Sequence, residues 1–395
     1  MFLIDLQDVG KMIHDKLVDF VKSHPFIYKT YYFVMSGFLG ILRLFIKVDN
    51  KLILFVSFGG RYFNESPKSL YEGMLKESRY KDYRLVWAFR HPEQWPDAKE
   101  RIKIDTLKYY ITALKAKCWV TNVAIERGLK FKRKEQFYFH TTHGTLPKKG
   151  QDGVGEGGFL PSGYSNFDLS CAYSPYEAKI QLSMFGLKEE NVFLSGLPKL
   201  DRLISINENE IIKIKSGINL PIGKKIILYA PTYREERKSS MTVDVHFDKW
   251  KQLLGDDFIV LFRAHPVVAN AMDLSKEKGF VYDVSTYPEN IELMAIADVL
   301  ISDYSGIFFE FAVLNRPMFC YAYDYDEYVS KRPLYFDIRK ELPGGMLKED
   351  DLIEMIKNNP PQVAEETKRF REKFVTEYGH ATNICIDRIY QEINK

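Results

Sequence analysis

Short apolar runs alternate with stretches of helical periodicity over most of the chain. The run KLILFVSF (51–58) ends at a Gly-Gly pair and is typical of a strand buried on both faces, and residues 66–78 after it have helical spacing. A second helix is predicted around residues 105–116. The other strands predicted in this half are YRLVWAF (83–89), KCWVTN (117–122), FYFHTTHG (137–144), FDLSCAYS (167–174) and NVFLSG (191–196). This alternation indicates an α/β fold with a parallel sheet.

The pattern begins again after a charged stretch at residues 201–224. A helix is predicted near residues 247–254, and one long amphipathic helical segment closes the chain over roughly residues 361–395. The runs between them are KKIILYAP (224–231), FIVLFRAHP (258–266), GFVYDVS (279–285), IELMAIA (291–297), DVLISD (298–303) and RPMFCYAY (316–323). Two doubly wound halves with a hinge near residues 200–222 are the simplest architecture, and ligands would then bind at the carboxyl ends of the strands, in a cleft between the halves.

The pattern therefore divides the chain into four parts. Residues 1–50 form a helical segment, residues 51–205 an N-terminal Rossmann-like domain and residues 206–365 a C-terminal Rossmann-like domain. Residues 366–395 are expected to form a C-terminal helix that packs back on the N-terminal domain. A length of 395 residues agrees with two domains, because single cores seldom grow beyond about 250–300 residues.

Composition and cysteine content narrow the function classes. Hydrophobic residues make up 46% of the chain and aromatic residues 14%, which favours large cores over disorder. The formal net charge of +3, without an arginine-rich tract or zinc-type cysteine spacing, does not favour nucleic-acid binding. The four cysteines are far apart in sequence and are expected to be buried free thiols. No cleavable signal is visible, so we expect an intracellular protein.

The N-terminal segment contains an apolar run, Thr30–Leu42, between Lys29 and Arg43. It is too short to cross a bilayer, which needs roughly 20 residues. The lysines and aromatic residues around it are typical of a helix in a membrane interface, and a helix packed on a globular domain is the alternative. A basic cluster at residues 127–134 would face the same anionic surface or form a solvated loop. The residues expected at the membrane are Tyr31, Phe33, Phe38, Leu42, Arg43, Lys132 and Arg133.

Polar residues gather where the predicted strands end. They are His140, His143, Thr232, Arg234, Arg263, His265, Ser302, Asp303 and Ser305. Loops at the carboxyl ends of core strands carry chemistry, so several such loops together predict a site. In ISDYSGIFFEF (301–311), the backbone amides around Ser305 and Gly306 would bind an anion such as phosphate, or Ser305 or Asp303 would form a plain N-cap. Glu310 would reach a ribose hydroxyl pair or lie on a solvated helix face.

The segment FYFHTTHGTLPKKG (137–150) contains two histidines three positions apart. On a strand and its loop, this spacing places the two side chains on different faces. No third ligand is obvious nearby, and Lys148 and Lys149 would repel a cation, so we expect no metal ion there. The chain also lacks a GxSxG elbow, a GxGxxG fingerprint and a Walker motif, which argues against a serine hydrolase, dinucleotide chemistry and P-loop chemistry.

Six motifs in order resemble the CDP-glycerol glycerophosphotransferase family, which contains teichoic acid primases and polymerases and related capsule enzymes. They are HTTHGTLPKKG, SPYEAKI, NVFLSGLPKLDRL, ILYAPTYRE, FRAHP and ISDYSGIFFEFAVLNRPMFCYAYD. The resemblance runs from about Lys51 to Gly345 and into the final helix. It implies a GT-B fold of two Rossmann-like domains, here with an N-terminal membrane-associated helical segment. One departure is Thr142, where the family often has an aromatic residue.

The resemblance implies an enzyme that transfers a polyol phosphate from CDP-glycerol or CDP-ribitol to an undecaprenyl-diphosphate-linked saccharide acceptor and releases CMP. No cofactor is implied, although a loosely held Mg²⁺ on the diphosphate stays open. The protein would be cytoplasmic and peripheral on the inner face of the cell membrane, with no nucleic-acid partner. Residues 51–205 would bind the acceptor and residues 206–365 the CDP donor.

The family's essential histidines correspond to His143 and His265, and its SDYS loop, here Ser302–Ser305, would bind the donor pyrophosphate. We expect His143 to act as the base and His265 to assist the donor phosphate, with swapped roles left open. His140 is expected to be structural. The donor contacts would come from Thr232, Arg234, Arg263, Ser302, Asp303, Ser305, Gly306 and Glu310, and the acceptor or phosphate contacts from Gly144, Thr145, Lys148 and Lys149.

Several alternatives stay open at this stage. Within the family, the choice lies between glycerol and ribitol and between primase and polymerase, and a single compact module favours a primase-like enzyme. A nucleotide-sugar glycosyltransferase or epimerase would use the same fold. A nucleotide-binding protein that has lost turnover is the alternative outside the enzymes, although the presence of both histidines argues against it.

Overall fold

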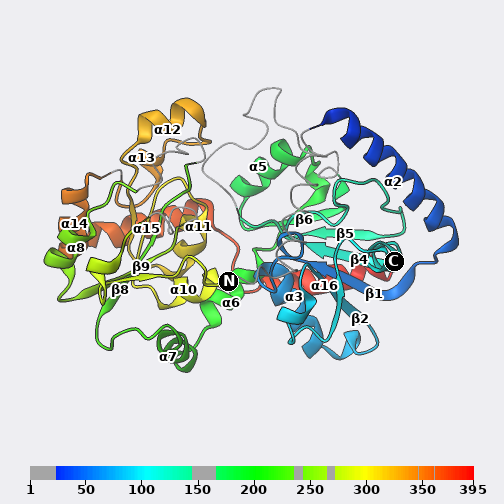
Figure 1. The fold of residues 1–395 in the computed structure, drawn as a ribbon, viewed down its shortest axis with the longest axis horizontal. Helices are drawn as coiled ribbons and strands as arrows, with labels where there is room; N and C mark the ends of the chain where they lie inside the picture. Colours follow the sequence, from blue (N-terminus) through cyan, green and yellow to red (C-terminus); the bar gives the residue numbers. More distant parts are fainter. Residues whose placement is uncertain (1–23, 145–165, 235–242, 265–271, 346, 360) are drawn as a thin grey trace, which may run out of the picture.

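Two parallel β-sheets with their covering helices lie side by side in the computed structural model (Figure 1). The structure describes residues 24–144, 166–234, 243–264, 272–345, 347–359 and 361–395. The α/β architecture with parallel sheets is therefore as predicted from the alternation of apolar runs and helical stretches.

The first sheet has seven strands in the order β3-β2-β1-β4-β5-β6-β7, and all of its pairings are parallel. The strands are β1 (Asp49–Val56), β2 (Arg84–Phe89), β3 (Glu100–Lys103), β4 (Ala116–Thr121), β5 (Phe137–His140), β6 (Leu169–Ala172) and β7 (Val192–Leu194). Strands β1, β4 and β5 are neighbours, so the loops that follow them leave the same edge of the sheet.

The second sheet has five parallel strands in the order β10-β9-β8-β11-β12. The strands are β8 (Lys225–Ala230), β9 (Phe258–Phe262), β10 (Val281–Asp283), β11 (Val299–Ser302) and β12 (Met318–Cys320). Strands β8 and β11 are adjacent, which brings the loop after residue 230 next to the SDYS loop that begins at Ser302.

Helices cover both sheets. In chain order they are α2 (Pro25–Phe45), α3 (Glu65–Lys76), α4 (Leu107–Lys115), α5 (Pro175–Phe185), α6 (Pro198–Ser205), α7 (Glu208–Gly217), α8 (Phe247–Leu254), α10 (Asn290–Ile296), α11 (Ile307–Phe311), α12 (Tyr325–Lys331), α13 (Ile338–Glu341), α14 (Glu349–Asn358), α15 (Pro361–Phe374) and α16 (Ala381–Ile393). Local sequence fixes their ends: α5 begins at the Ser174 cap with Pro175 in its first turn and ends at Gly186 in a left-handed conformation.

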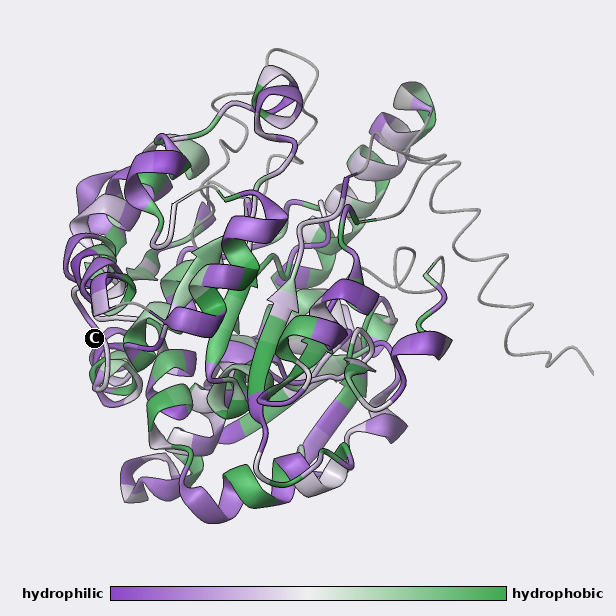
Figure 2. Cartoon of the chain, turned by 90° about the vertical axis from the view of Figure 1, so that its left-hand side faces the viewer, coloured by the Kyte–Doolittle hydropathy of each residue, from purple (hydrophilic) through white to green (hydrophobic). Residues whose placement is uncertain are grey.

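The cores consist of strands buried on both faces and the apolar sides of the helices. Figure 2 shows hydrophobic residues concentrated along the strands, whereas the helices carry hydrophilic and hydrophobic segments in turn. Trp87 and Trp119 are fully buried around the first sheet, and Trp250 is fully buried around the second. All four cysteines are buried free thiols, as expected.

Two segments differ from the sequence prediction. The charged stretch expected to act as a hinge contains helices α6 and α7, and Asn207 and Glu210 form a capping box at the start of α7. The C-terminal segment, predicted as one long helix, is two helices, because the chain crosses from the second sheet to the first between α15 and α16. There the amides of Thr376 and Glu377 donate to the carbonyl oxygen of Tyr173.

Helix α16 packs on the helices and strands of the first sheet. The Tyr80 hydroxyl donates to the carbonyl oxygen of Ile386 at 2.9 Å, and Arg79 forms an ion pair with Asp387. Gly196 permits a close approach where the chain crosses, since its φ is +81° and a Cβ there would lie 2.7 Å from the carbonyl oxygen of Glu377.

Helix α2 is longer than the apolar run that predicted it and lies on the outside of the first sheet (Figure 1). Leu39 is fully buried, and Leu42 packs against the core behind it, so the expectation that Leu42 faces a membrane is wrong. In the part of the chain that the structure describes, no helix has both the length and the apolar character needed to cross a bilayer.

Candidate active site

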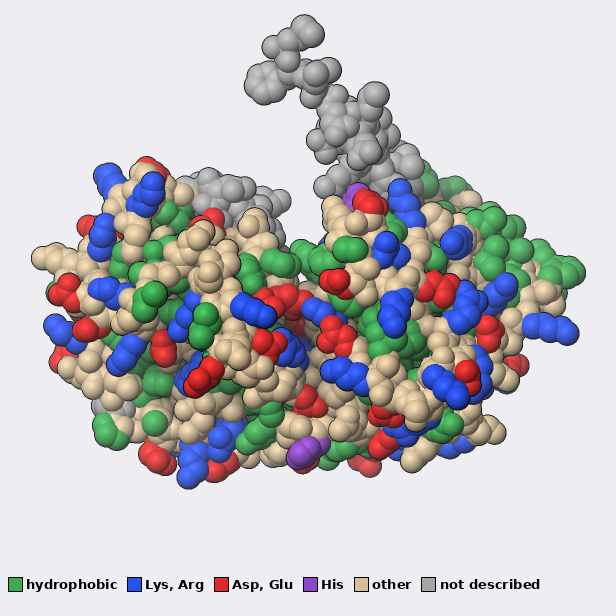
Figure 3. Space-filling view, turned by 90° about the horizontal axis from the view of Figure 1, so that it is seen from below, with side chains coloured by type: hydrophobic (Ala, Val, Ile, Leu, Met, Phe, Trp, Pro, Cys, Tyr) green, Lys and Arg blue, Asp and Glu red, His purple; other side chains and the backbone are tan. Residues whose placement is uncertain are grey.

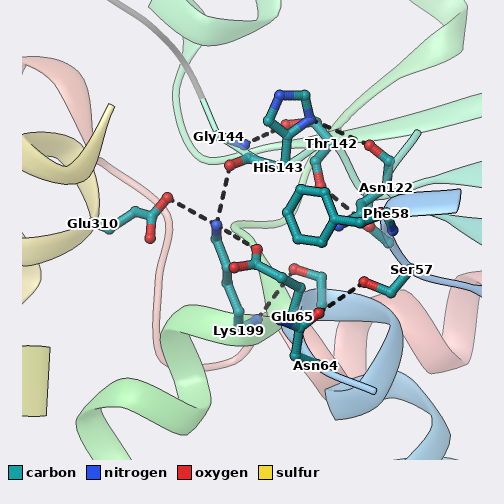
Figure 4. Close-up of polar contacts among 12 residues, drawn as sticks. Ser57, Phe58, Asn64, Glu65, Asn122, Thr142, His143, Gly144, Lys199 and Glu310 are labelled. Carbon is teal, nitrogen blue, oxygen red and sulfur yellow. Dashed lines mark hydrogen bonds and ion pairs between the residues drawn. The ribbon is translucent and has the colours of Figure 1, made fainter. Parts of the chain in front are cut away.

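Three loops from the carboxyl edge of the first sheet meet around His143 (Figure 4). His143 lies three residues past the end of β5, Asn122 follows β4 and Phe58 follows β1. The Phe58 amide donates to the Asn122 side-chain oxygen at 2.8 Å, and the Phe58 ring lies 6.0 Å from the His143 ring, centroid to centroid. The sheet order therefore brings together residues that are far apart in sequence.

The contacts of His143 define which ring nitrogen carries a proton. Its Nδ1 lies 3.3 Å from the carbonyl oxygen of Asn122, and a carbonyl oxygen only accepts hydrogen bonds. Nδ1 is therefore the protonated nitrogen of the neutral ring, and the lone pair that acts as a base is on Nε2. The side chain is exposed at the end of its loop. This arrangement suits a histidine that accepts a proton from a substrate.

The backbone around His143 is unusual in its conformation. Phe58, Glu65 and Thr142 have φ values of +44°, +63° and +49°, which residues other than glycine seldom adopt. Thr142 accepts a hydrogen bond from the Gly144 amide on its hydroxyl at 2.8 Å. Left-handed non-glycine residues cost free energy and gather at functional sites, so their presence here supports a site at this edge.

A buried ion cluster lies directly under the His143 loop. Lys199 Nζ is 2.6 Å from a Glu65 carboxylate oxygen, 2.8 Å from Glu310 Oε1 and 3.2 Å from the carbonyl oxygen of His143. The exposed fractions of the Lys199, Glu65 and Glu310 side chains are 2%, 10% and 8%. Lys199 and Glu65 were not among the predicted site residues, although Lys199 lies in the motif NVFLSGLPKLDRL.

The pairing of Glu310 differs from the contact expected from the sequence. Its carboxylate, expected to meet a ribose or to lie on a solvated helix face, is buried and faces Lys199. Burial raises the pKa of Glu310 to about 7, and Lys199 opposes that rise. Burial would lower the pKa of Lys199, but Glu310 and Glu65 together raise it above its ordinary value, so Lys199 keeps its charge.

Arg234 is held inside the second unit by two carboxylates. Its guanidinium lies 2.9 Å from an oxygen of Asp303 and 2.8 Å from an oxygen of Asp324. It also lies over the stacked rings of Tyr304 and Tyr328, whose centroids are 3.6 Å apart. The charge that was expected to meet the donor phosphates is therefore compensated within the protein, and Arg234 braces the SDYS loop.

The other residues expected to contact the donor differ in how far their polar groups are paired within the protein. The Thr232 amide donates to Asp303 at 2.9 Å, while the buried Thr232 hydroxyl has no hydrogen-bond partner among the described residues. Ser302 donates its hydroxyl to the carbonyl oxygen of Ala230 at 2.6 Å. The Ser305 hydroxyl accepts from the Ile307 amide at 3.2 Å, a local contact, whereas α11 has Gly306 as its N-cap and no side-chain cap hydrogen bond. Gly306 precedes α11.

Arg263, another expected donor contact, forms hydrogen bonds within the second unit. Arg263 donates to the carbonyl oxygens of Val284 and Tyr287 at 3.0 and 2.8 Å and so fixes the loop after β10. The other four candidates lie outside the described residues; they are His265, Thr145, Lys148 and Lys149.

His140 and His143 do not share a site. His140 is 1% exposed, stacks on Phe167 with 3.9 Å between the ring centroids, and places its Nδ1 3.2 Å from the Ser170 hydroxyl. Burial lowers its pKa to about 3, so the ring is neutral at physiological pH. Within the described ranges, no group of three or more His, Cys, Asp or Glu side chains is arranged to hold a metal ion.

Two parallel sheets covered by helices, with the histidine loop at the carboxyl edge of the first sheet, define a GT-B-like protein. The chain belongs to the CDP-glycerol:poly(glycerophosphate) glycerophosphotransferase family, whose pattern matches residues 38–393. The chain is 33% identical over 381 residues to a teichoic acid poly(glycerol phosphate) polymerase of Staphylococcus epidermidis, which covers 88% of this chain and 52% of that protein. It is 32% identical over 377 residues to a teichoic acid glycerol-phosphate transferase of Staphylococcus aureus, with 88% of this chain and 95% of that protein covered.

Solved structures give the same assignment. A histidine-to-asparagine variant of the wall teichoic acid polymerase TagF, soaked with CDPG (CDP-glycerol), superposes with a TM-score of 0.82 at 30% identity, over 91% of this chain and 93% of that one. A UDP-GlcNAc 2-epimerase from Neisseria meningitidis bound to UDP-GlcNAc has a TM-score of 0.55 at 12% identity, over 86% of this chain and 99% of that one, which shows likeness of fold alone.

Proposed function

We propose that the protein transfers glycerol phosphate from CDP-glycerol to a lipid-linked saccharide acceptor and releases CMP, in the synthesis of teichoic acid or a related wall or capsule polymer. The observation that carries the proposal is His143, exposed at the carboxyl edge of the first sheet with its Nδ1 on the Asn122 carbonyl oxygen, in a chain of this family. CDP-ribitol is the alternative donor.

The geometry supports a direct displacement at phosphorus. The acceptor hydroxyl gives its proton to Nε2 of His143 as its oxygen attacks the phosphorus that carries glycerol. The bond between that phosphorus and the bridging oxygen breaks, and the electron pair leaves with CMP. We assign donation to a phosphoryl oxygen to the Thr232 hydroxyl, whose lack of a hydrogen-bond partner among the described residues supports this role, and assistance of the leaving group to His265. Exchange of the two histidine roles is the alternative.

The two sheet units are proposed to divide the substrates. Residues 51–205 would receive the acceptor at the His143 loop, and residues 206–365 would receive the CDP donor at the loops after β8 and β11. The adjacency of Thr232 and Asp303 supports the second assignment, because ligands of doubly wound sheets bind where neighbouring strands end.

We propose a primase-like transfer of one or a few units, with long-chain polymerisation as the alternative. The chain spans 95% of the S. aureus transferase but about half, 52%, of the S. epidermidis polymerase. The product length made by the purified protein, measured by mass spectrometry, distinguishes a single addition from a polymer.

Release of CMP tests the proposed function. Purified protein given CDP-glycerol and a soluble lipid-linked disaccharide analogue is expected to release CMP and add glycerol phosphate to the acceptor. CDP-ribitol and UDP-GlcNAc are tested as alternative donors under the same conditions. Release from CDP-ribitol alone would name ribitol as the polyol. Turnover of UDP-GlcNAc without turnover of either CDP donor would replace the proposal with a nucleotide-sugar enzyme on this fold.

We also propose that α2 attaches the protein to the inner face of the cell membrane. Its outward side carries a continuous set of exposed apolar side chains, while its inner side packs on the first sheet. They are Phe26, Phe33, Val34, Phe38, Ile41, Leu44 and Phe45, with Tyr31 beside them. Figure 3 shows hydrophobic side chains gathered at the edge of the molecule that carries this helix. An apolar face of this extent supports an interface helix.

The basic residues expected at the membrane have partners inside the protein. Lys132 forms an ion pair with Asp168 at 2.8 Å, and Arg133 donates to the carbonyl oxygens of Arg43 and Ile46 at the end of α2. Arg133 therefore stabilises the helix C-terminus. The attachment we propose relies on the apolar face of α2 and on the exposed Arg43 side chain.

Charged substitutions on α2 test the attachment. Phe33→Asp or Ile41→Asp is expected to weaken binding to anionic phospholipid vesicles by about tenfold or more, because burying one large apolar side chain contributes about 1.5–3 kcal/mol. Ile222→Asp is the control, since Ile222 is fully exposed but far along the chain from α2. Vesicle sedimentation would measure the change, and equal binding by all three variants would contradict the proposal.

A further inference from the structure

Lys199 connects three parts of the molecule that meet at the candidate active site (Figure 4). It lies in the first turn of α6, which follows β7 of the first sheet. Glu65 begins α3, also beside the first sheet, whereas Glu310 lies on α11, which follows β11 of the second sheet. The ammonium group contacts both carboxylates and the carbonyl oxygen of His143. One buried side chain thus joins both sheet units to the histidine loop.

The contact with the loop is a backbone contact, so it acts on the placement of His143. The Lys199 ammonium donates to the carbonyl oxygen that precedes Gly144. Gly144 has a φ of +109°, and a Cβ there would lie 2.9 Å from Glu310 Oε1. The loop backbone is therefore seated directly on the ion cluster. At its other side, the imidazole is held by the Asn122 carbonyl oxygen, so the ring is fixed between two anchors.

The ion cluster joins the two units at a high cost in desolvation free energy. Moving charged groups out of water costs free energy, and well-packed apolar side chains often stabilise as much. A second ion pair between the units, Lys68 with Glu289 at 3.2 Å, lies nearby on α3 and is more exposed. No described contact joins that pair to the His143 loop. The buried cluster thus has a contact that simple attachment of the units does not require.

We propose that Lys199 is a positioning residue for the transfer reaction: by joining Glu310 of the second unit to the His143 carbonyl oxygen, it sets the orientation of the imidazole when the two units are together. Glu65 holds the ammonium group from the first unit. The inference rests on the proposed function for its kinetic consequence, but the placement of the ring does not depend on which donor is used.

One variant and a matched control are the first test of this role in the whole chain. Lys199→Met keeps the length of the side chain and removes the charge, and it is expected to lower kcat for CMP release by about 100-fold, since displacement of a reacting group by about 1 Å has an effect of that size. The KM for CDP-glycerol is expected to change by less than about threefold, because misplacement of the base acts on the transition state. Lys68→Met, which removes the other ion pair between the units, is the matched control and should leave both constants within about twofold.

Glu310→Gln keeps the shape of the side chain and provides a second test if Lys199→Met does not fold. It is expected to lower kcat by about tenfold, because the amide oxygen still accepts from Lys199 but without a charge. Lys199→Arg keeps the charge and is expected to recover part of the activity. A change in KM without a fall in kcat would overturn the positioning role. Equal losses of kcat in Lys199→Met and Lys68→Met would also overturn it.

Nitrogen NMR of the histidine rings separates this proposal from the proposed function. The His143 signal, identified by its absence in His143→Gln, is expected to show the Nδ1–H form in the wild type and a mixture of the two neutral forms in Lys199→Met. His140 serves as the internal reference, since its ring is buried and stacks on Phe167. If the wild type releases no CMP from any donor, the proposed function fails. The His143 ring signal still tests whether Lys199 orients the imidazole. An unchanged signal in Lys199→Met would overturn the inference.

Discussion

Replacing His143 with glutamine is expected to lower the rate of CMP release by about 10²–10⁴-fold, the range that a positioned general base contributes. The glutamine amide still forms hydrogen bonds, but it does not accept the proton of the attacking hydroxyl at neutral pH. The side chain is exposed, so the fold should be retained. Steady-state CMP release at saturating donor and acceptor measures the loss, and circular dichroism checks the fold.

His246→Gln is the matched control for this experiment. His246 is also exposed, precedes α8 and pairs with Glu349 at the start of α14. Its replacement should leave CMP release within about twofold, since surface ion pairs contribute little. A His143→Gln protein that is well folded and retains more than about a tenth of the wild-type rate would assign the base to another group.

The strands were predictable because burial on both faces leaves a continuous apolar signal. The apolar runs at 51–58 and 258–266 each coincide with a central strand. Edge strand β3 (Glu100–Lys103) was not predicted, because the strand is short and most of its residues are polar. Helices α6 and α7 were not predicted: α6 is only eight residues long, and α7 lies in a charged stretch with Ile214 alone buried.

The site was predictable in its position but only partly in its contacts. Parallel strands place their carboxyl ends at one edge, so His143 and Thr232 could be assigned to loops that carry chemistry. The pairing of Lys199 with Glu310 joins residues 111 positions apart, and no local pattern specifies such a pair. Likewise, the sequence shows that Arg234 is basic, but it does not show that two aspartates hold it.

Replacing Arg234 with methionine is expected to destabilise the second unit by about 3–5 kcal/mol, the usual effect of removing one partner from a buried ion pair. Asp303 and Asp324 are 2% and 5% exposed, so their charges would stay buried without a cation. Asp303 also accepts from the amides of Thr232 and Tyr304, and the loops that carry the proposed donor contacts should therefore loosen together. Chemical denaturation, followed by the fluorescence of Trp250 in a variant that lacks the other tryptophans, would measure the change.

Two comparisons identify the buried charges as the cause. Arg339→Met removes an exposed ion pair with Asp337 and is expected to change stability by at most about 1 kcal/mol. Adding Asp324→Asn to Arg234→Met removes one uncompensated carboxylate and should recover part of the lost stability, since a buried amide costs less than a buried charge. If the double variant is less stable than Arg234→Met alone, the loss comes from the packing of the guanidinium on Tyr304 and Tyr328 rather than from charge.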